Sequence, residues 1–272
     1  MSTSKATKDL EQEGTTQEIP QYNLWMILFM FAWPAAWFLF LMYVIGPLFL
    51  VAPDGTLPTW GFHLVWLLGN GAELIVALII LRREGYRLTP RALRERINWR
   101  FPDKLWKWGA VLGVFIAATA ASMLLAPFQR SIAAVLPPPD WMPGHPLKEI
   151  TGLQDVYPDV NFAGNFPFFL YRSVVLGFVM NMIGEELYYR GALQPKMRGV
   201  FGRWDWVANG IGFALKHVYF WWRLHFLWPG GLAFAFIFGP MGSLPLSILA
   251  HWIGNQEPFI LIGILSAVLG GG

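Results

Sequence analysis

Three residue pairs in the second half of the chain share one spacing. The members of each pair are four positions apart and would lie on one face of a helix: Glu186 with Arg190, Phe213 with His217, and His251 with Asn255. Glu185 directly precedes Glu186, and consecutive residues of a helix diverge by about 100°. One of these two carboxylates can therefore face a cavity while the other pairs with Arg190.

Residues of these types can activate water. A carboxylate in an apolar, partly dry cavity accepts a proton more readily than one held beside an arginine, as a general base must. A carboxylate and an imidazole can take a proton from water, while a second imidazole and an amide donate hydrogen bonds to a developing oxyanion, each worth about 2.7–4 kcal/mol. Because no Ser, Cys or Asp nucleophile stands in a recognisable context, the expected reaction is hydrolysis of an amide bond.

The elements that position these residues are membrane helices. Of the 272 residues, 55% are hydrophobic and 14% are charged, against about 45–50% and about 25% in soluble domains. This composition excludes a water-soluble globular protein and an intrinsically disordered one. The sequence contains no cysteine, which excludes disulfide scaffolds, iron–sulfur clusters and thiolate zinc sites.

We predict an all-α fold, a polytopic transmembrane helical bundle with seven or eight spans. About 20 apolar residues are enough to cross the hydrocarbon core. The expected helices cover residues 24–48, 60–81, 108–128, from 166 onward, 206–222, 232–238 with its flanks, 246–255 and 259–269. Residues 1–22 are expected to form a disordered cytoplasmic tail, and residues 23–272 a single transmembrane domain with its catalytic motifs in 166–255.

The distribution of positive charge predicts the orientation in the membrane. Nine of the 20 Lys and Arg residues fall between Arg82 and Lys107, and the positive-inside rule places such a loop in the cytoplasm. The N-terminus is then cytoplasmic, and the loop of residues 129–165 is extracytoplasmic. Because a cytoplasmic loop accounts for this cluster, the net charge of +3 does not indicate a nucleic-acid partner.

Three motifs follow one another in the second half of the chain: EELYYRG at 185–191, FALKH at 213–217 and HWIGN at 251–255. Together and in this order they resemble the CAAX protease and bacteriocin-processing family of intramembrane glutamic proteases. The resemblance covers about Phe166 to Asn255. It implies an intramembrane endopeptidase without a cofactor, which cleaves a membrane-associated or lipidated protein or peptide in the lipid bilayer. The eukaryotic branch of the family cleaves prenylated CAAX motifs, but the motifs do not identify the substrate of this chain.

The same resemblance implies a role for each site residue. Glu185 and His217 would activate the water. His251 and Asn255 would hold the oxyanion, and Glu186 with Arg190 would brace the site. The site would open toward the cytosolic side. The protein would lie in a prokaryotic plasma membrane.

Structural roles remain open for the same residues. Glu186 and Arg190 can form a purely structural ion pair. Phe213 is expected to pack against its neighbours and to position the helix that carries His217. The two histidines and Asn255 can also hold helices together by hydrogen bonds.

Three further charges lie in or beside apolar segments. Glu73 and Arg172 are a candidate pair across two helices, because a charge in the bilayer needs a partner. Lys216 is expected to point away from its neighbour His217, and to snorkel or line a polar cavity. Glu185 has no obvious partner nearby in the sequence.

Three other functions would use the same residues differently. A non-catalytic immunity or scaffold protein of the same fold is one alternative. A zinc-dependent membrane protease is another, since one Glu and two His can hold zinc with one open position, although the HExxH spacing is absent. A transporter is disfavoured because the hydropathy pattern contains no inverted repeat.

Overall fold

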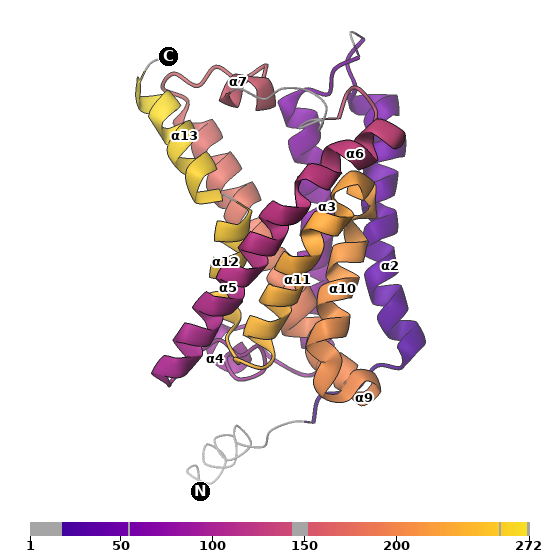
Figure 1. The fold of residues 1–272 in the computed structure, drawn as a ribbon, viewed down its shortest axis with the longest axis vertical. Coiled ribbons are helices and arrows are strands. Elements are labelled where there is room, and N and C mark those ends of the chain that lie inside the picture. Colours follow the sequence, from indigo (N-terminus) through magenta and orange to yellow (C-terminus); the bar gives the residue numbers. More distant parts are fainter. Residues whose placement is uncertain (1–17, 54, 143–151, 256, 271–272) are drawn as a thin grey trace, which may run out of the picture.

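The chain is all-helical. The structure is a computed structural model that describes residues 18–53, 55–142, 152–255 and 257–270, and these contain helices but no strand (Figure 1). The predicted all-α fold is therefore confirmed. Of the expected tail of residues 1–22, residues 1–17 lie outside the described part, whereas the Tyr22 N–H donates to the carbonyl of Lys196 at 2.9 Å.

The hydrophobic segments form helices long enough to cross a membrane. Four helices have the length and apolar composition of spans: Leu24–Leu50, Thr59–Arg83, Leu105–Leu125 and, within a longer helical run, Phe166–Arg223. Three apolar helices are shorter: Leu227–Phe238, Leu244–Gly254 and Ile260–Gly270. Each predicted segment overlaps one of these helices. The protein is an integral membrane protein.

The first half of the bundle contains two long helices and a crossing helix. Their bounds are α2 (Leu24–Phe40), continued by η2 (Leu41–Leu50), then α3 (Thr59–Arg83), the short α4 (Pro90–Leu93) and α5 (Leu105–Leu125). α5 ends before the expected residue 128, because a separate helix α6 (Pro127–Val135) begins at Pro127. Proline lacks the N–H that would continue the first helix and is favoured in a first turn. The short α7 (Leu153–Val156) follows.

The second half of the chain supplies the helices around the motif residues. In chain order these are α8 (Phe166–Leu170), η3 (Tyr171–Gly184), η4 (Leu187–Leu193), η5 (Gln194–Met197), α9 (Arg198–Phe201), η6 (Gly202–Trp204), α10 (Asp205–Lys216), η7 (His217–Arg223), α11 (Leu224–Phe238), α12 (Leu244–Gly254) and α13 (Glu257–Gly270). The expected helix 206–222 tightens at His217 into η7. In a regular α-helix the Phe213 carbonyl would accept a hydrogen bond from the backbone N–H of His217. Here the side-chain Nδ1 of His217 lies 2.8 Å from that carbonyl instead.

The two ends of the bundle carry different elements. Figure 1 shows α4, α9 and the start of α2 at one end, and α6, α7 and the end of α13 at the other. Between these ends α5 runs obliquely across α11 (Figure 1). No residue of α5, all of which the structure describes, is buried. This helix therefore lies at the periphery of the bundle.

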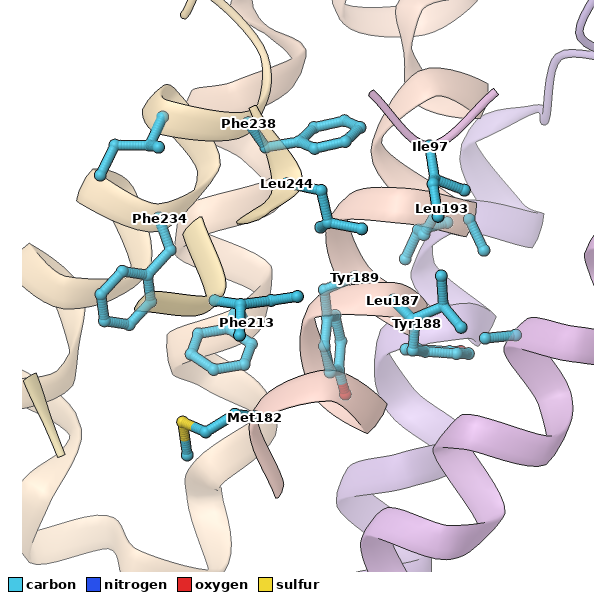
Figure 2. Close-up of a cluster of buried hydrophobic side chains, with 14 of the residues drawn as sticks. Ile97, Met182, Leu187, Tyr188, Tyr189, Leu193, Phe213, Phe234, Phe238 and Leu244 are labelled. Carbon is cyan, nitrogen blue, oxygen red and sulfur yellow. The ribbon is translucent and has the colours of Figure 1, made fainter. Parts of the chain in front are cut away.

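The largest hydrophobic core surrounds η4. Figure 2 shows Tyr189 of η4 beside Phe213 of α10, and their ring centroids are 5.0 Å apart. α10 and α11 approach closely at Gly210, where an added Cβ would lie 2.8 Å from the Cα of Leu232. Small residues let membrane helices pack at such short distances. This crossing brings the helix of Phe213 and His217 against α11.

Candidate active site

The two adjacent glutamates lie at an irregular point of their helix. η3 and η4 are wound in wide π-helical turns, and Glu185 and Glu186 lie between them. Such turns are uncommon and frequently occur at functional sites. Both glutamates are buried, with exposed fractions of 1% and 0%. A buried carboxylate needs bonding partners, and the two glutamates have different ones.

Glu185 belongs to a buried charge network that spans three helical segments. The Lys216 ammonium at the end of α10 lies 2.9 Å from Glu185 Oε1 and 3.1 Å from Glu73 Oε1 on α3. The hydroxyl of Tyr189 also donates to Glu73 Oε1, at 2.8 Å. Lys216 engages one oxygen of Glu185 and leaves Oε2 toward His251, whose Nε2 is 3.8 Å away.

This network corrects two expectations from the sequence. Lys216 neither snorkels nor lines the cavity; its side chain is fully buried between two carboxylates. It is the partner of Glu185, from 31 positions away in the sequence. The expected Glu73–Arg172 pair is wrong, because Arg172 instead forms a two-point ion pair with Glu257, at 2.9 and 3.2 Å.

Glu186 has three partners. Arg190 Nη1 and His251 Nδ1 lie 3.2 and 2.9 Å from its Oε1, and the Ser247 hydroxyl donates to its Oε2. The Arg190 guanidinium stacks 4.1 Å from the ring centroid of Phe213. Glu186 therefore joins η4 to α12 through two side chains, Ser247 and His251.

The two histidines are held in the same way, each through Nδ1. Since the Phe213 carbonyl only accepts hydrogen bonds, Nδ1 of His217 carries the proton and Nε2 keeps its lone pair in the neutral ring. His251 Nδ1 faces the Glu186 carboxylate, which also only accepts when ionised. Phe213 lies between the two imidazoles, with ring centroids at 4.9 and 5.6 Å. It packs as expected and also orients His217 through its carbonyl.

A cavity of about 940 Å³ lies beside these residues. Its wall includes the four residues expected to be catalytic: Glu185, His217, His251 and Asn255. Asn255 follows the last turn of α12, and its backbone N–H donates to the His251 carbonyl at 2.9 Å. Glu186 and Arg190, both with an exposed fraction of 0%, lie behind this wall. The structure thus brings all six predicted site residues together in two layers.

The cavity extends away from the basic loop. Along η3 its wall continues from Glu185 back to Arg172, and on α13 it reaches Ile260. α13 ends beside α7, at the end of the bundle opposite α4 (Figure 1). The resemblance implied an opening toward the cytosolic side, and which end of the bundle is cytosolic stays a prediction. On the side of the basic loop, the Glu186 ion pairs and the core of Figure 2 fill the space.

The donor groups do not fit a zinc site. Within the part of the chain that the structure describes, no group of three or more His, Asp or Glu residues is arranged to hold a metal ion. Glu185 is bound to Lys216, and His251 turns its Nδ1 to Glu186. Zinc would have to displace the lysine ammonium from the carboxylate it now neutralises.

Comparison with known proteins identifies a family for this segment. The model of the family described as type II CAAX prenyl endopeptidase Rce1-like matches residues 167–256. No curated protein and no solved structure matches the chain. The match, about a third of the chain, contains all six predicted site residues, and the resemblance inferred from the motifs is confirmed. Glu73 and α5 lie outside it.

Proposed function

Residues 167–256 belong to the Rce1-like family of type II CAAX prenyl endopeptidases, and on this premise we propose that the protein is an intramembrane endopeptidase. It hydrolyses a peptide bond in a membrane-associated or lipidated protein or peptide, with water activated by Glu185 and His217. One observation carries the proposal. Glu185, His217 and the pair His251 and Asn255 come from three separate parts of the sequence, and all four residues line one cavity.

The proposed reaction begins with a water molecule between Glu185 and His217. Glu185 Oε2 and the His217 Nε2 lone pair are the acceptors for its proton, because Lys216 occupies Oε1 and the Phe213 carbonyl occupies Nδ1. The water oxygen attacks the carbonyl carbon of the scissile bond. The proton then passes to the departing amine nitrogen, the carbon–nitrogen bond breaks, and a carboxylic acid and an amine result.

His251 and Asn255 stabilise the negative charge on the carbonyl oxygen. In its doubly protonated form, His251 donates from Nε2 to this oxygen and from Nδ1 to the Glu186 carboxylate 2.9 Å away. The Asn255 amide supplies the second donor. Donors fixed in a dry site contribute about 2.7–4 kcal/mol each to the lowering of the barrier.

Glu186 and Arg190 support the site without touching the substrate. Glu186 fixes the ring of His251 through Nδ1, and Arg190 holds Glu186 and stacks on Phe213. A third group that orients a catalytic imidazole is a recurring device in hydrolases. We place residues 23–272, as a single transmembrane domain, in a prokaryotic plasma membrane. The positive charge of residues 82–107 supports a cytoplasmic N-terminus.

The experiment compares cells that carry the wild type, Glu185→Gln, Glu95→Gln or no copy. Glu95 is an exposed carboxylate in the basic loop and serves as the matched control. Peptides or new C-termini in membrane and secreted fractions should appear only with the wild type and Glu95→Gln. In a purified assay, Glu185→Gln should lower kcat by about 10²–10⁴-fold.

One result would replace this proposal with the scaffold alternative. If Glu185→Gln behaves like the wild type while the cells without a copy differ from both, the protein acts by binding rather than by chemistry. Insertion and folding of each variant are checked by its yield in membranes and by its thermal unfolding in detergent.

A further inference from the structure

One face of η3 lines the cavity along the length of the helix. The cavity wall includes Arg172, Leu176, Gly177 and Asn181, and then Glu185 directly after η3. In a π-helix each hydrogen bond reaches five residues back, so side chains four or five positions apart share one face. In an α-helix, with about 100° per residue, the thirteen positions from Arg172 to Glu185 would turn these two side chains to different sides. The wide turns of η3 therefore keep one row of side chains on the cavity wall.

One end of this row is an ion pair. Arg172 is bound to Glu257 of α13 at 2.9 and 3.2 Å and donates from Nε to the Tyr157 hydroxyl at 2.7 Å. Gly177 makes room for the pair, because an added Cβ would lie 2.9 Å from both Arg172 Nη1 and Glu257 Oε2. Arg172 and Glu257 therefore neutralise each other at this end of the row.

Asn181 lies between this ion pair and the proposed base. The Glu185 N–H donates to the Asn181 carbonyl, which places the two residues one turn apart. No residue that the structure describes forms a hydrogen bond with the side-chain amide of Asn181. This side chain is partly exposed on the cavity wall, whereas the next residue, Met182, is buried in the core of Figure 2. An amide in an apolar interior needs hydrogen-bond partners, and those of Asn181 must come from the contents of the cavity.

We propose that Asn181 binds the backbone of an extended peptide beside the scissile bond. This inference rests on the proposed function and adds a substrate-binding residue to it. The amide of Asn181 offers two N–H donors and one carbonyl acceptor. It can therefore pair with the C=O and the N–H of one substrate residue, as a neighbouring β-strand does. The group that Asn181 recognises is a peptide backbone rather than a particular side chain.

The position of Asn181 determines which substrate residue it contacts. Residues one turn apart on one helix face have Cβ atoms about 5–6 Å apart, and an extended peptide covers about 3.3 Å per residue. The contacted residue therefore lies about two positions from the bond that Glu185 hydrolyses. Proline has no N–H, so a proline at this position would lose one of the two hydrogen bonds.

The test measures binding of a peptide probe to the full-length protein in detergent. The probe is a capped, fluorescent hexapeptide of alternating leucine and alanine, because apolar side chains such as Phe115 and Leu176 belong to the cavity wall. The parent protein carries Glu185→Gln, so that the probe is not cleaved. Asn181→Leu removes the amide from the cavity wall. Asn161→Leu makes the same change at an exposed asparagine outside that wall and serves as the matched control.

Fluorescence anisotropy gives the Kd of the probe for each variant. Asn181→Leu should raise Kd about tenfold, because two hydrogen bonds are lost, and Asn161→Leu should bind like the parent. The proposal is overturned if Asn181→Leu binds the probe as tightly as the parent. It is also overturned if the parent does not bind the probe, because a backbone contact does not depend on the side chains of the peptide. Asn181→Ala repeats the measurement if thermal unfolding shows that Asn181→Leu does not fold.

Methylated probes test the backbone contact itself. Each backbone nitrogen of the hexapeptide is methylated in turn. At one position, methylation should weaken binding to the parent several-fold and leave binding to Asn181→Leu unchanged, because both changes remove the same hydrogen bond. If every methylated probe loses equal affinity for both proteins, Asn181 only shapes the cavity and the proposal is wrong.

Kinetics separate the role of Asn181 from the proposed function. In the protein that retains Glu185, Asn181→Leu should lower kcat/KM about tenfold for the substrate found in the comparison of cells. An active protease in which Asn181→Leu leaves kcat/KM unchanged refutes the binding role alone. A protein that binds the probe through Asn181 but cleaves nothing refutes the proposed function alone.

Discussion

Lys216 and Glu73 are 143 positions apart in the chain and meet in the interior of the membrane domain, with the lysine ammonium 3.1 Å from the carboxylate. The same ammonium lies 2.9 Å from Glu185. Glu73 lies outside the segment that matches the protease family. α3 therefore contributes to the site indirectly, by fixing the cation that neutralises the proposed base.

Replacement of Lys216 should therefore impair catalysis more than binding. Lys216→Met leaves two buried carboxylates without their cation, a loss that typically costs about 3–5 kcal/mol. We expect kcat to fall at least tenfold with little change in KM, and Lys216→Arg to recover part of kcat because it restores the charge. Steady-state kinetics and thermal unfolding in detergent measure both effects. A purely structural lysine would show the loss of stability with kcat unchanged in the folded fraction.

Much of the fold could be predicted from the sequence because it depends on local patterns. Runs of about 20 apolar residues mark membrane helices wherever they occur, although the expected helix 108–128 missed the break at Pro127 between α5 and α6. The spacing of Glu186 and Arg190 similarly predicted their ion pair, since residues four apart are neighbours on one helix.

The missed parts depend on how distant helices pack. Glu73 was expected to pair with Arg172, but Arg172 lies near the end of the cavity and meets Glu257, 85 positions away. A pattern of hydropathy gives the position of a charge along its own helix and does not give the height or rotation of the helix beside it. The partners of Glu73 and Glu185, and the direction of the cavity, therefore became visible only in the packed structure.

Removal of one partner of the buried Glu186–Arg190 pair should lower the stability of the fold much more than removal of both. Glu186→Gln or Arg190→Met alone leaves one buried charge unpaired and should destabilise the fold by about 3–5 kcal/mol. The double variant should lose less than the sum of the two. Thermal unfolding of the four proteins forms the double-mutant cycle. Activity should stay low in the double variant because His251 has lost the Glu186 oxygen at 2.9 Å, and strictly additive losses of stability would contradict a direct pair.

Glu84 makes the attachment of the basic loop dependent on pH. It lies just after α3; burial there would raise its pKa, but hydrogen bonds from Arg96 and Lys196 outweigh burial and lower the pKa of Glu84 below its ordinary 4.5. A folded-state pKa below the unfolded one stabilises the fold at pH values above the unfolded pKa. This contribution is lost as the pH falls through the folded pKa.

Thermal unfolding from pH 7 to pH 3 measures this contribution. The difference in Tm between the wild type and Glu84→Gln should be constant near neutral pH and should shrink below about pH 4.5. Glu95→Gln, at an exposed position of the same loop, should follow the wild type throughout. A difference for Glu84→Gln that persists undiminished to pH 3 would mean that its charge does not stabilise the loop.

The crossing of α10 and α11 should not tolerate a side chain at Gly210. A Cβ there would lie 2.8 Å from Leu232 Cα and 2.9 Å from the Gly231 carbonyl oxygen, both rigid backbone atoms. Gly210→Ala should destabilise the protein by about 1–3 kcal/mol. Gly109→Ala in α5 meets nothing within 4 Å and should stabilise its helix by roughly 0.5–1 kcal/mol. Gly210→Ala should have a lower Tm than Gly109→Ala. A Tm of Gly210→Ala that equals or exceeds that of Gly109→Ala would contradict the close crossing.

Removal of metal ions separates the proposed mechanism from a zinc-dependent one. Glu185 is neutralised by Lys216 at 2.9 Å and not by a metal ligand set. Peptidase activity should therefore change less than twofold after treatment with EDTA or 1,10-phenanthroline. A zinc protease would lose activity with the chelator and regain it when zinc is added, because the metal itself activates the water. Recovery by zinc after such a loss would mean that a metal ion performs the role proposed for Glu185 and Lys216.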